Sequence, residues 1–228
     1  MQTKPYNYES IFYSVTQSGL LIKMSNRSMF SKDAVIPSVL PNGQKITAID
    51  TQFLSGPFGT VTVDNNISII NEEAFSSSNV REVVWPSECK KIPEGCFCGS
   101  KIKKVSNIDG VTHISQCAFL SSCIEEFVWP SGCNRVPRLC FADSQLKTIT
   151  NLENVKFIED GAFHNAKYIE HLDLLGCQIE TLGTASLYKV PTDSIGFPYY
   201  LDEYMLKSAF ALEFPPEGVR ILDPEEES

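Results

Sequence analysis

An internal repeat of 22 residues constrains the fold of this chain more than any single motif. Six phenylalanines follow one another at that spacing, namely Phe53, Phe75, Phe97, Phe119, Phe141 and Phe163. The columns five, eight and fourteen residues after the phenylalanines stay apolar from unit to unit, with occupants such as Ile102, Val105 and Val111. A unit this short cannot bury its own apolar face, so successive units must stack on one another. The pattern therefore predicts a solenoid.

The segments that follow the phenylalanines predict one strand per turn. Residues 80–85, 102–107, 124–129 and 146–151 are rich in β-branched and aromatic side chains and alternate in polarity. Stacking these strands gives a parallel β-sheet on one face of the solenoid. The stretches around the phenylalanines, such as residues 92–97, are too short for a full α-helix. We expect short turns or single-turn 3₁₀ segments there, on the other face.

A second period, of 44 residues, distinguishes alternate turns. Trp85 and Trp129 each open a Trp-Pro-Ser sequence, whereas Asn107 and Asn151 hold the same column in the turns between them. Counting in twos along each strand places the tryptophans on the inward face, and this favours core packing over exposed platforms for carbohydrate. The same count predicts that the asparagines are buried amides that bond to the backbone of adjacent turns.

The repeats belong to a single domain that is capped at both ends, because an uncapped solenoid would expose its core. We assign residues 1–45 to an N-terminal cap with a β-hairpin formed by residues 11–15 and 20–24. Residues 46–198 form the repeats, and residues 199–228 form a C-terminal cap with an acidic tail at 223–228. The register loosens after Phe163, and a last, shortened unit is expected at residues 209–215.

Composition and charge narrow the classes of partner. The chain has 228 residues, of which 43% are hydrophobic and 21% charged, as in soluble folded proteins. No apolar run approaches the roughly 18 residues needed to span a membrane, so no membrane insertion is expected. The net charge of −9 argues against binding to nucleic acid, which attracts basic proteins.

Eight cysteines suggest at first either disulfides or a metal site. Cys89 and Cys133 share one column two turns apart, and so do Cys96 and Cys140. Two strand spacings separate such a pair by about 9.6 Å, beyond the limit of about 7 Å for a disulfide, so these residues are interpreted as small core side chains with free thiols. Their spacing does not fit a zinc ribbon, and we expect neither a metal nor a cofactor.

The thiols also bear on location. Free thiols and an N-terminus without the apolar core of a signal peptide favour a reducing compartment such as the cytoplasm. The alternative is the cell surface or secretion, if a leader has been removed.

The motif around the phenylalanines resembles that of the BspA-like (Treponema-type) leucine-rich repeats. It is clearest in residues 92–97, Ile-Pro-Glu-Gly-Cys-Phe, and in residues 158–163, Ile-Glu-Asp-Gly-Ala-Phe. The resemblance extends over about residues 35–187. It implies a curved leucine-rich-repeat solenoid of parallel strands and a role in protein binding. Members of this family are often surface adhesins of bacteria and protozoa that attach to host matrix or to other microbes, and they share no catalytic residues.

The side chains between the inward columns must project from the open face of the sheet. They form a mixed-charge strip beside a band of small and β-branched residues, which suits a protein or peptide better than a phosphate backbone. The candidate partner-binding residues are Arg81, Glu82, Val84, Lys104, Ser106, Glu126, Val128, Thr148, Thr150, His171 and Asp173. An alternative is that this face is merely solvated.

The sequence therefore predicts a monomeric, non-catalytic protein-binding module. None of its three histidines lies in a metal-binding or catalytic motif, so we assign no catalytic residue. Two alternatives remain open: a fragment of a cell-surface adhesin that binds host or microbial surface molecules, and a structural spacer from a longer repeat array.

Overall fold

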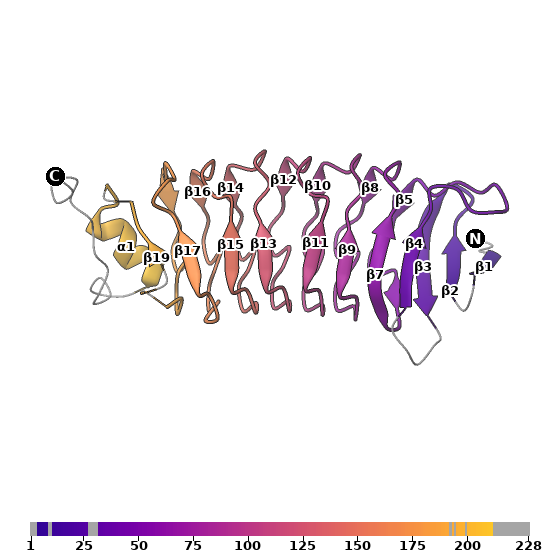
Figure 1. Ribbon diagram of the computed structural model, residues 1–228, viewed down its shortest axis with the longest axis horizontal. Coiled ribbons are helices and arrows are strands. Elements are labelled where there is room, and N and C mark those ends of the chain that lie inside the picture. The colour runs from indigo at the N-terminus through magenta and orange to yellow at the C-terminus, as the bar shows by residue number, and fades with distance from the viewer. Residues whose placement is uncertain are drawn as a thin grey trace.

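The computed structural model shows an elongated stack of turns that ends in a short helix (Figure 1). The structure describes residues 4–8, 11–26, 32–191, 193, 195–198 and 200–211. Each regular turn contributes one strand to each of two parallel sheets, which we call the main sheet and the second sheet. The expected solenoid with parallel strands is confirmed.

The main sheet contains the strands that the sequence predicts. Its pairings run in two parallel groups, β4–β7–β9–β11 and β13–β15–β17–β19. The register joins residues 22 positions apart, such as Val83 with Val105 and Phe127 with Ile149. The bounds are β4 (Lys32–Ile36), β7 (Phe58–Val63), β9 (Glu82–Val84), β11 (Lys104–Ser106), β13 (Glu126–Val128), β15 (Thr148–Thr150), β17 (His171–Asp173) and β19 (Ile195–Gly196).

The second sheet was not predicted from the sequence, which gave only one strand per turn. Each of its repeat strands has two residues, and in five of the seven the inward one, such as Ile92 or Ile114, lies five residues before a phenylalanine. A strand this short shows no alternation that a sequence pattern could reveal. The bounds are β5 (Ala48–Ile49), β8 (Ile69–Ile70), β10 (Lys91–Ile92), β12 (His113–Ile114), β14 (Arg135–Val136), β16 (Phe157–Ile158) and β18 (Thr181–Leu182).

As expected, the segments around the phenylalanines are short. Each consists of consecutive hydrogen-bonded turns and does not form a 3₁₀ helix. The Cys96 and Cys98 N–H groups donate three residues back, to Pro93 and Gly95. Between them, the Gly95 and Phe97 N–H groups donate to the next turn. Successive N–H groups thus donate alternately within the segment and to the next repeat. This alternation requires a positive φ at two positions in each repeat, such as 59° at Gly95.

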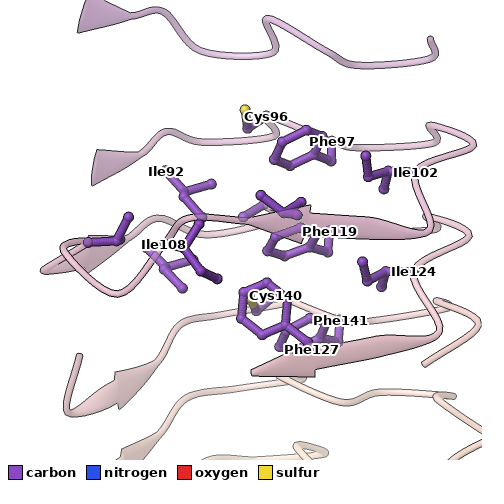
Figure 2. Packing of buried hydrophobic residues seen from close by; sticks show 14 of the residues in the cluster. Ile92, Cys96, Phe97, Ile102, Ile108, Phe119, Ile124, Phe127, Cys140 and Phe141 are labelled. Atoms are coloured by element: carbon purple, nitrogen blue, oxygen red, sulfur yellow. The ribbon is translucent and has the colours of Figure 1, made fainter. Parts of the chain in front are cut away.

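The phenylalanine column forms the spine of the core. Neighbouring rings from Phe53 to Phe163 have centroids 5.1 to 5.7 Å apart, and all but the first pair are stacked. Figure 2 shows Phe97, Phe119 and Phe141 in one row beside Ile102 and Ile124. The stack explains why phenylalanine recurs at this position in six successive turns.

The two members of the 44-residue superperiod behave differently. Trp85 and Trp129 are fully buried, as predicted, and each indole N–H donates to a backbone oxygen four residues on. Asn107 and Asn151 were wrongly predicted to be buried, because both are exposed. Their φ angles of 61° and 65° turn the side chain outward. The predicted bonds to adjacent turns are present, since each amide donates to the carbonyl oxygen of a tryptophan 22 residues earlier.

At the N-terminal end, β1 (Lys4–Tyr8), β2 (Ile11–Val15) and β3 (Leu20–Asn26) form an antiparallel sheet. Strand β3 also pairs in parallel with β5 and with β6 (Leu54–Ser55), so this segment continues directly into the second sheet. Strand β4 does the same for the main sheet. The domain boundary at residue 45 stays a prediction.

Helix α1 (Glu203–Phe210) closes the other end. Asp202 caps it by accepting a hydrogen bond from the Met205 N–H. The Leu187 N–H donates to the Ala209 oxygen, which puts Phe210 in the phenylalanine column. The last unit expected at residues 209–215 therefore begins in register, but in helical form. The acidic tail at 223–228 lies outside the described residues.

Candidate interaction surface

The structure brings the eleven candidate residues to one side of the main sheet, which we call the exposed face. All of them are exposed or half-buried, while the residues between them on each strand are buried. Arg81 precedes β9, and the other ten lie in pairs on the strands β9, β11, β13, β15 and β17. Because the strands are three residues long, each turn offers two strand side chains to a partner.

Ion pairs run along the stack on this face. Glu125 pairs with Lys103 of the preceding turn and, at 3.0 Å, with Lys147 of the next turn. Lys104 approaches Glu82 at 3.9 Å, although its side chain is 66% exposed. Exposed pairs of this kind contribute at most about 1 kcal/mol each. The alternating charges thus largely compensate one another within the molecule.

Some groups on the exposed face have no such compensation. Among the described residues, neither Arg81 nor Glu126 has an ion pair. Beside Glu126, Val128 is 57% exposed. An exposed apolar side chain flanked by an uncompensated carboxylate can contribute both burial and charge to a partner.

Two shallow hollows lie on or beside this face. One has a volume of about 280 Å³ and lies between β11 and β13, lined by Lys103, Lys104, Val105, Glu125, Glu126 and Val128. The other has a volume of about 260 Å³ and includes Thr150, His171 and Asp173 in its lining. The first hollow has lysines on one wall and glutamates on the other.

Lys103 and Glu125 are not among the candidate residues predicted from the sequence. They line the first hollow and make the contact between its walls. The signal that could have identified them is the alternation Lys103, Glu125, Lys147 at a spacing of 22, which allows ion pairs between successive turns.

The cysteines show no sign of reactive chemistry. All eight carry free thiols, and five are buried: Cys89, Cys96, Cys133, Cys140 and Cys177. Burial raises the pKa of Cys133 and of Cys177 to about 11, so both stay protonated near neutral pH. Cys177 extends the column of Cys89 and Cys133 by another 44 residues. The five buried cysteines serve as core side chains.

Within the described residues, no group of three or more histidine, cysteine, aspartate or glutamate side chains is arranged to hold a metal ion. The helix in this part of the chain is too short to span a membrane.

Comparison with known proteins identifies the repeat. The family model of the BspA type leucine rich repeat region matches residues 47–170 in six copies. No curated protein matches the chain in sequence. The match covers more than half of the 228 residues and includes nine of the eleven candidate residues.

Two solved structures resemble the fold. A leucine rich cell surface protein from Faecalibacterium prausnitzii superposes with a TM-score of 0.56 at 15% identity, covering 86% of this chain and 55% of that protein. The pneumococcal vaccine antigen PcpA gives a TM-score of 0.51 at 14% identity, covering 87% of this chain and 71% of that one. At such identities the likeness shows the fold alone. The chain spans about half the length of the first protein.

Proposed function

Because the chain belongs to the family of proteins with BspA-type leucine-rich repeats, we propose that it is a non-catalytic protein-binding module. The partner docks on the exposed face between β9 and β17. The observation that carries this proposal is the row of projecting side chains that differ from turn to turn, from Glu82 to Lys104 to Glu126. The stack presents them in a fixed order from turn to turn, which gives a partner both charge pattern and register to recognise.

Exposed apolar contact adds to this pattern. Val84 and Val128 stand in the same column two turns apart, with Ser106 between them. A partner that covers Val128 removes apolar area from water while its charged groups reach Glu126 and Arg81. Binding of this kind needs a polypeptide with both apolar and charged side chains, because a nucleic acid would meet a face of mixed charge on an acidic protein.

A second candidate is an adhesin at the cell surface. It is supported by the description of the Faecalibacterium neighbour as a cell surface protein. In that case the same exposed face would contact a surface protein of a host or of another microbe. The two candidates share a binding mode and differ in location.

The test starts by finding the partner through its contact site. A photo-crosslinking residue in place of Val128 should capture the partner. The same residue at Gln145, which is exposed in the segment before β15 and outside the sheet, should not. Capture from Gln145 alone would instead place binding on the segments that connect the phenylalanine column to the main sheet.

The second arm measures affinity with purified partner. Reversing Glu82→Lys, Lys104→Glu and Glu126→Lys together keeps the Glu82–Lys104 contact in inverted form, so stability should change little. Binding should weaken at least about tenfold and lose salt dependence. The control reverses Lys156 and Glu180, an exposed pair at 3.0 Å beside the second sheet, and should bind normally. Unchanged binding by the folded triple variant would contradict the proposal.

A further inference from the structure

The backbone pairing of the stack is interrupted at one place in both sheets. In this fully described part of the chain, no ladder joins β11 to β13 in the main sheet or β12 to β14 in the second sheet. On either side, β9 pairs with β11 and β13 with β15. Figure 1 shows these as two closer pairs with a wider interval between β11 and β13. We call this interruption, between residues 103–115 and residues 125–137, the seam.

The flanking backbone bonds are also missing at the seam. In other turns, Lys147 donates its N–H to Glu125, Trp129 to Thr150 and Lys156 to Asn134. The equivalent N–H groups at the seam belong to Glu125, Asn107 and Asn134, and none of them donates to the neighbouring turn. The Asn107 bond is not particular to the seam, because the N–H of Asn151 also lacks it where β15 and β17 are paired. The loss therefore affects the whole stretch from one sheet to the other.

Pro137 explains the interruption in the second sheet. It occupies the position of Ser115, whose N–H donates to Ile92, and a proline has no N–H to give. Asn107 ends β11 with a φ of 61°, but Asn151 ends β15 with a φ of 65° where β15 and β17 are paired, so this conformation does not by itself interrupt the main sheet. Pro93 breaks the second sheet in the same way between β8 and β10, but the main sheet stays paired there between β7 and β9. Both sheets are broken together only at the seam, among the regular turns from β7 to β17.

Packing and exposure agree with the hydrogen bonds. The hollow of about 280 Å³ lies over the seam. Val105 in its floor is 8% exposed, whereas its column neighbours Val83 and Phe127 are 0% and 3% exposed. Side chains still cross the seam, including the Lys103–Glu125 ion pair and the Cys133 thiol, 3.7 Å from the Val111 oxygen.

The phenylalanine side, by contrast, is continuous. Phe119 stacks on Phe97 and on Phe141 with centroids 5.2 Å away in each case. Its N–H donates to Cys140, and the Phe97 N–H donates to Ala118. Backbone hydrogen bonds cross the seam on the phenylalanine side but not between the strands of either sheet, and this arrangement describes a hinge.

We infer that the solenoid consists of two hydrogen-bonded blocks that open at the seam about the phenylalanine spine. The first block ends at β12 and the second begins at β13. Opening widens the hollow between the lysine and glutamate walls, and so changes the spacing of β11 and β13 on the exposed face. This inference concerns the chain alone and does not depend on whether that face binds a partner.

Amide hydrogen exchange measured residue by residue tests the inference in the wild-type protein. The N–H groups of Glu125 and Asn134 should exchange at least about tenfold faster than their equivalents in the next turn, Lys147 and Lys156. Equal protection of the two sets would overturn it.

A pair of variants tests the hinge itself. Pro137→Ser restores the N–H that Ser115 supplies one turn earlier, and should slow exchange of the two seam amides about threefold to tenfold. Pro93→Ser makes the same change where the main sheet is intact, and should leave those amides unchanged. An equal effect of both variants, or none from Pro137→Ser in a folded protein, would contradict the hinge. If Pro137→Ser fails to fold, the wild-type comparison decides.

Discussion

Removing the ring of Phe119 should be among the most costly single changes in this protein. The side chain is fully buried, and its ring meets those of Phe97 and Phe141 at 5.2 Å and that of Phe127 at 4.9 Å. Truncation of a buried phenylalanine to alanine costs about 3–5 kcal/mol. Each aromatic pair adds roughly 0.5–1.5 kcal/mol beyond the buried area, so the three pairs place Phe119→Ala near the upper limit, at about 5 kcal/mol.

Phe53 provides the comparison within the same column. It is as deeply buried, at 1% exposure, but among the described residues its one aromatic neighbour is Phe75 at 5.1 Å. We expect Phe53→Ala to cost about 3 kcal/mol. It is also covered by β3, whose Met24 N–H donates to the Phe53 oxygen, so it does not lie at a free end of the stack.

Urea unfolding at equilibrium, followed by the fluorescence of the two buried tryptophans, measures both losses. Phe119→Ala should lose at least about 1 kcal/mol more than Phe53→Ala. Equal losses, or a loss below about 1.5 kcal/mol for Phe119→Ala, would refute the stacked spine.

Three further outcomes are expected. Replacing Asn107 by alanine should cost about 1–3 kcal/mol in urea unfolding, because it removes the bond to the Trp85 oxygen and leaves a non-glycine residue at positive φ, and glycine there should cost less. Since burial raises the pKa of Cys133 and Cys177 from 9.0 to about 11, the folded state retains protons that the unfolded state releases. Stability should then fall as the pH rises from 9 towards 11, and replacing both by valine should reduce that fall. A thiol reagent at neutral pH should label the folded protein only at the half-buried Cys98, Cys117 and Cys123, and rapid labelling of all eight thiols would contradict the burial.

Much of the fold could be predicted because the repeat determines it. A column that is apolar in every unit has to face the core, and counting in twos from such columns placed Trp85 and Trp129 correctly inside. The candidate surface followed from the same counting, since the residues between inward positions have to point outward. The residues of the exposed face could therefore be identified from the sequence alone.

The errors have local causes. Counting in twos assumes strand conformation, and Asn107 and Asn151 leave it through positive φ, so their side chains point outward. The apolar residues that follow, Ile108 and Leu152, are buried beside them and could have indicated this change. The seam could not be predicted from the sequence either. Pro137 indicates the loss of one hydrogen-bond donor, whereas the loss of pairing in the main sheet is visible only in the structure.

The stacking of residues 22 positions apart can be measured directly by nuclear Overhauser effects between backbone protons. Parallel pairing predicts contacts between Val83 and Val105 and between Phe127 and Ile149, with Ile149 contacting Leu172 after the inserted residue. Contacts between Val105 and Phe127 should be weaker, since no ladder joins their strands. Contacts mainly three and four residues apart, as in helices, or no contacts at a spacing of 22, would contradict the solenoid.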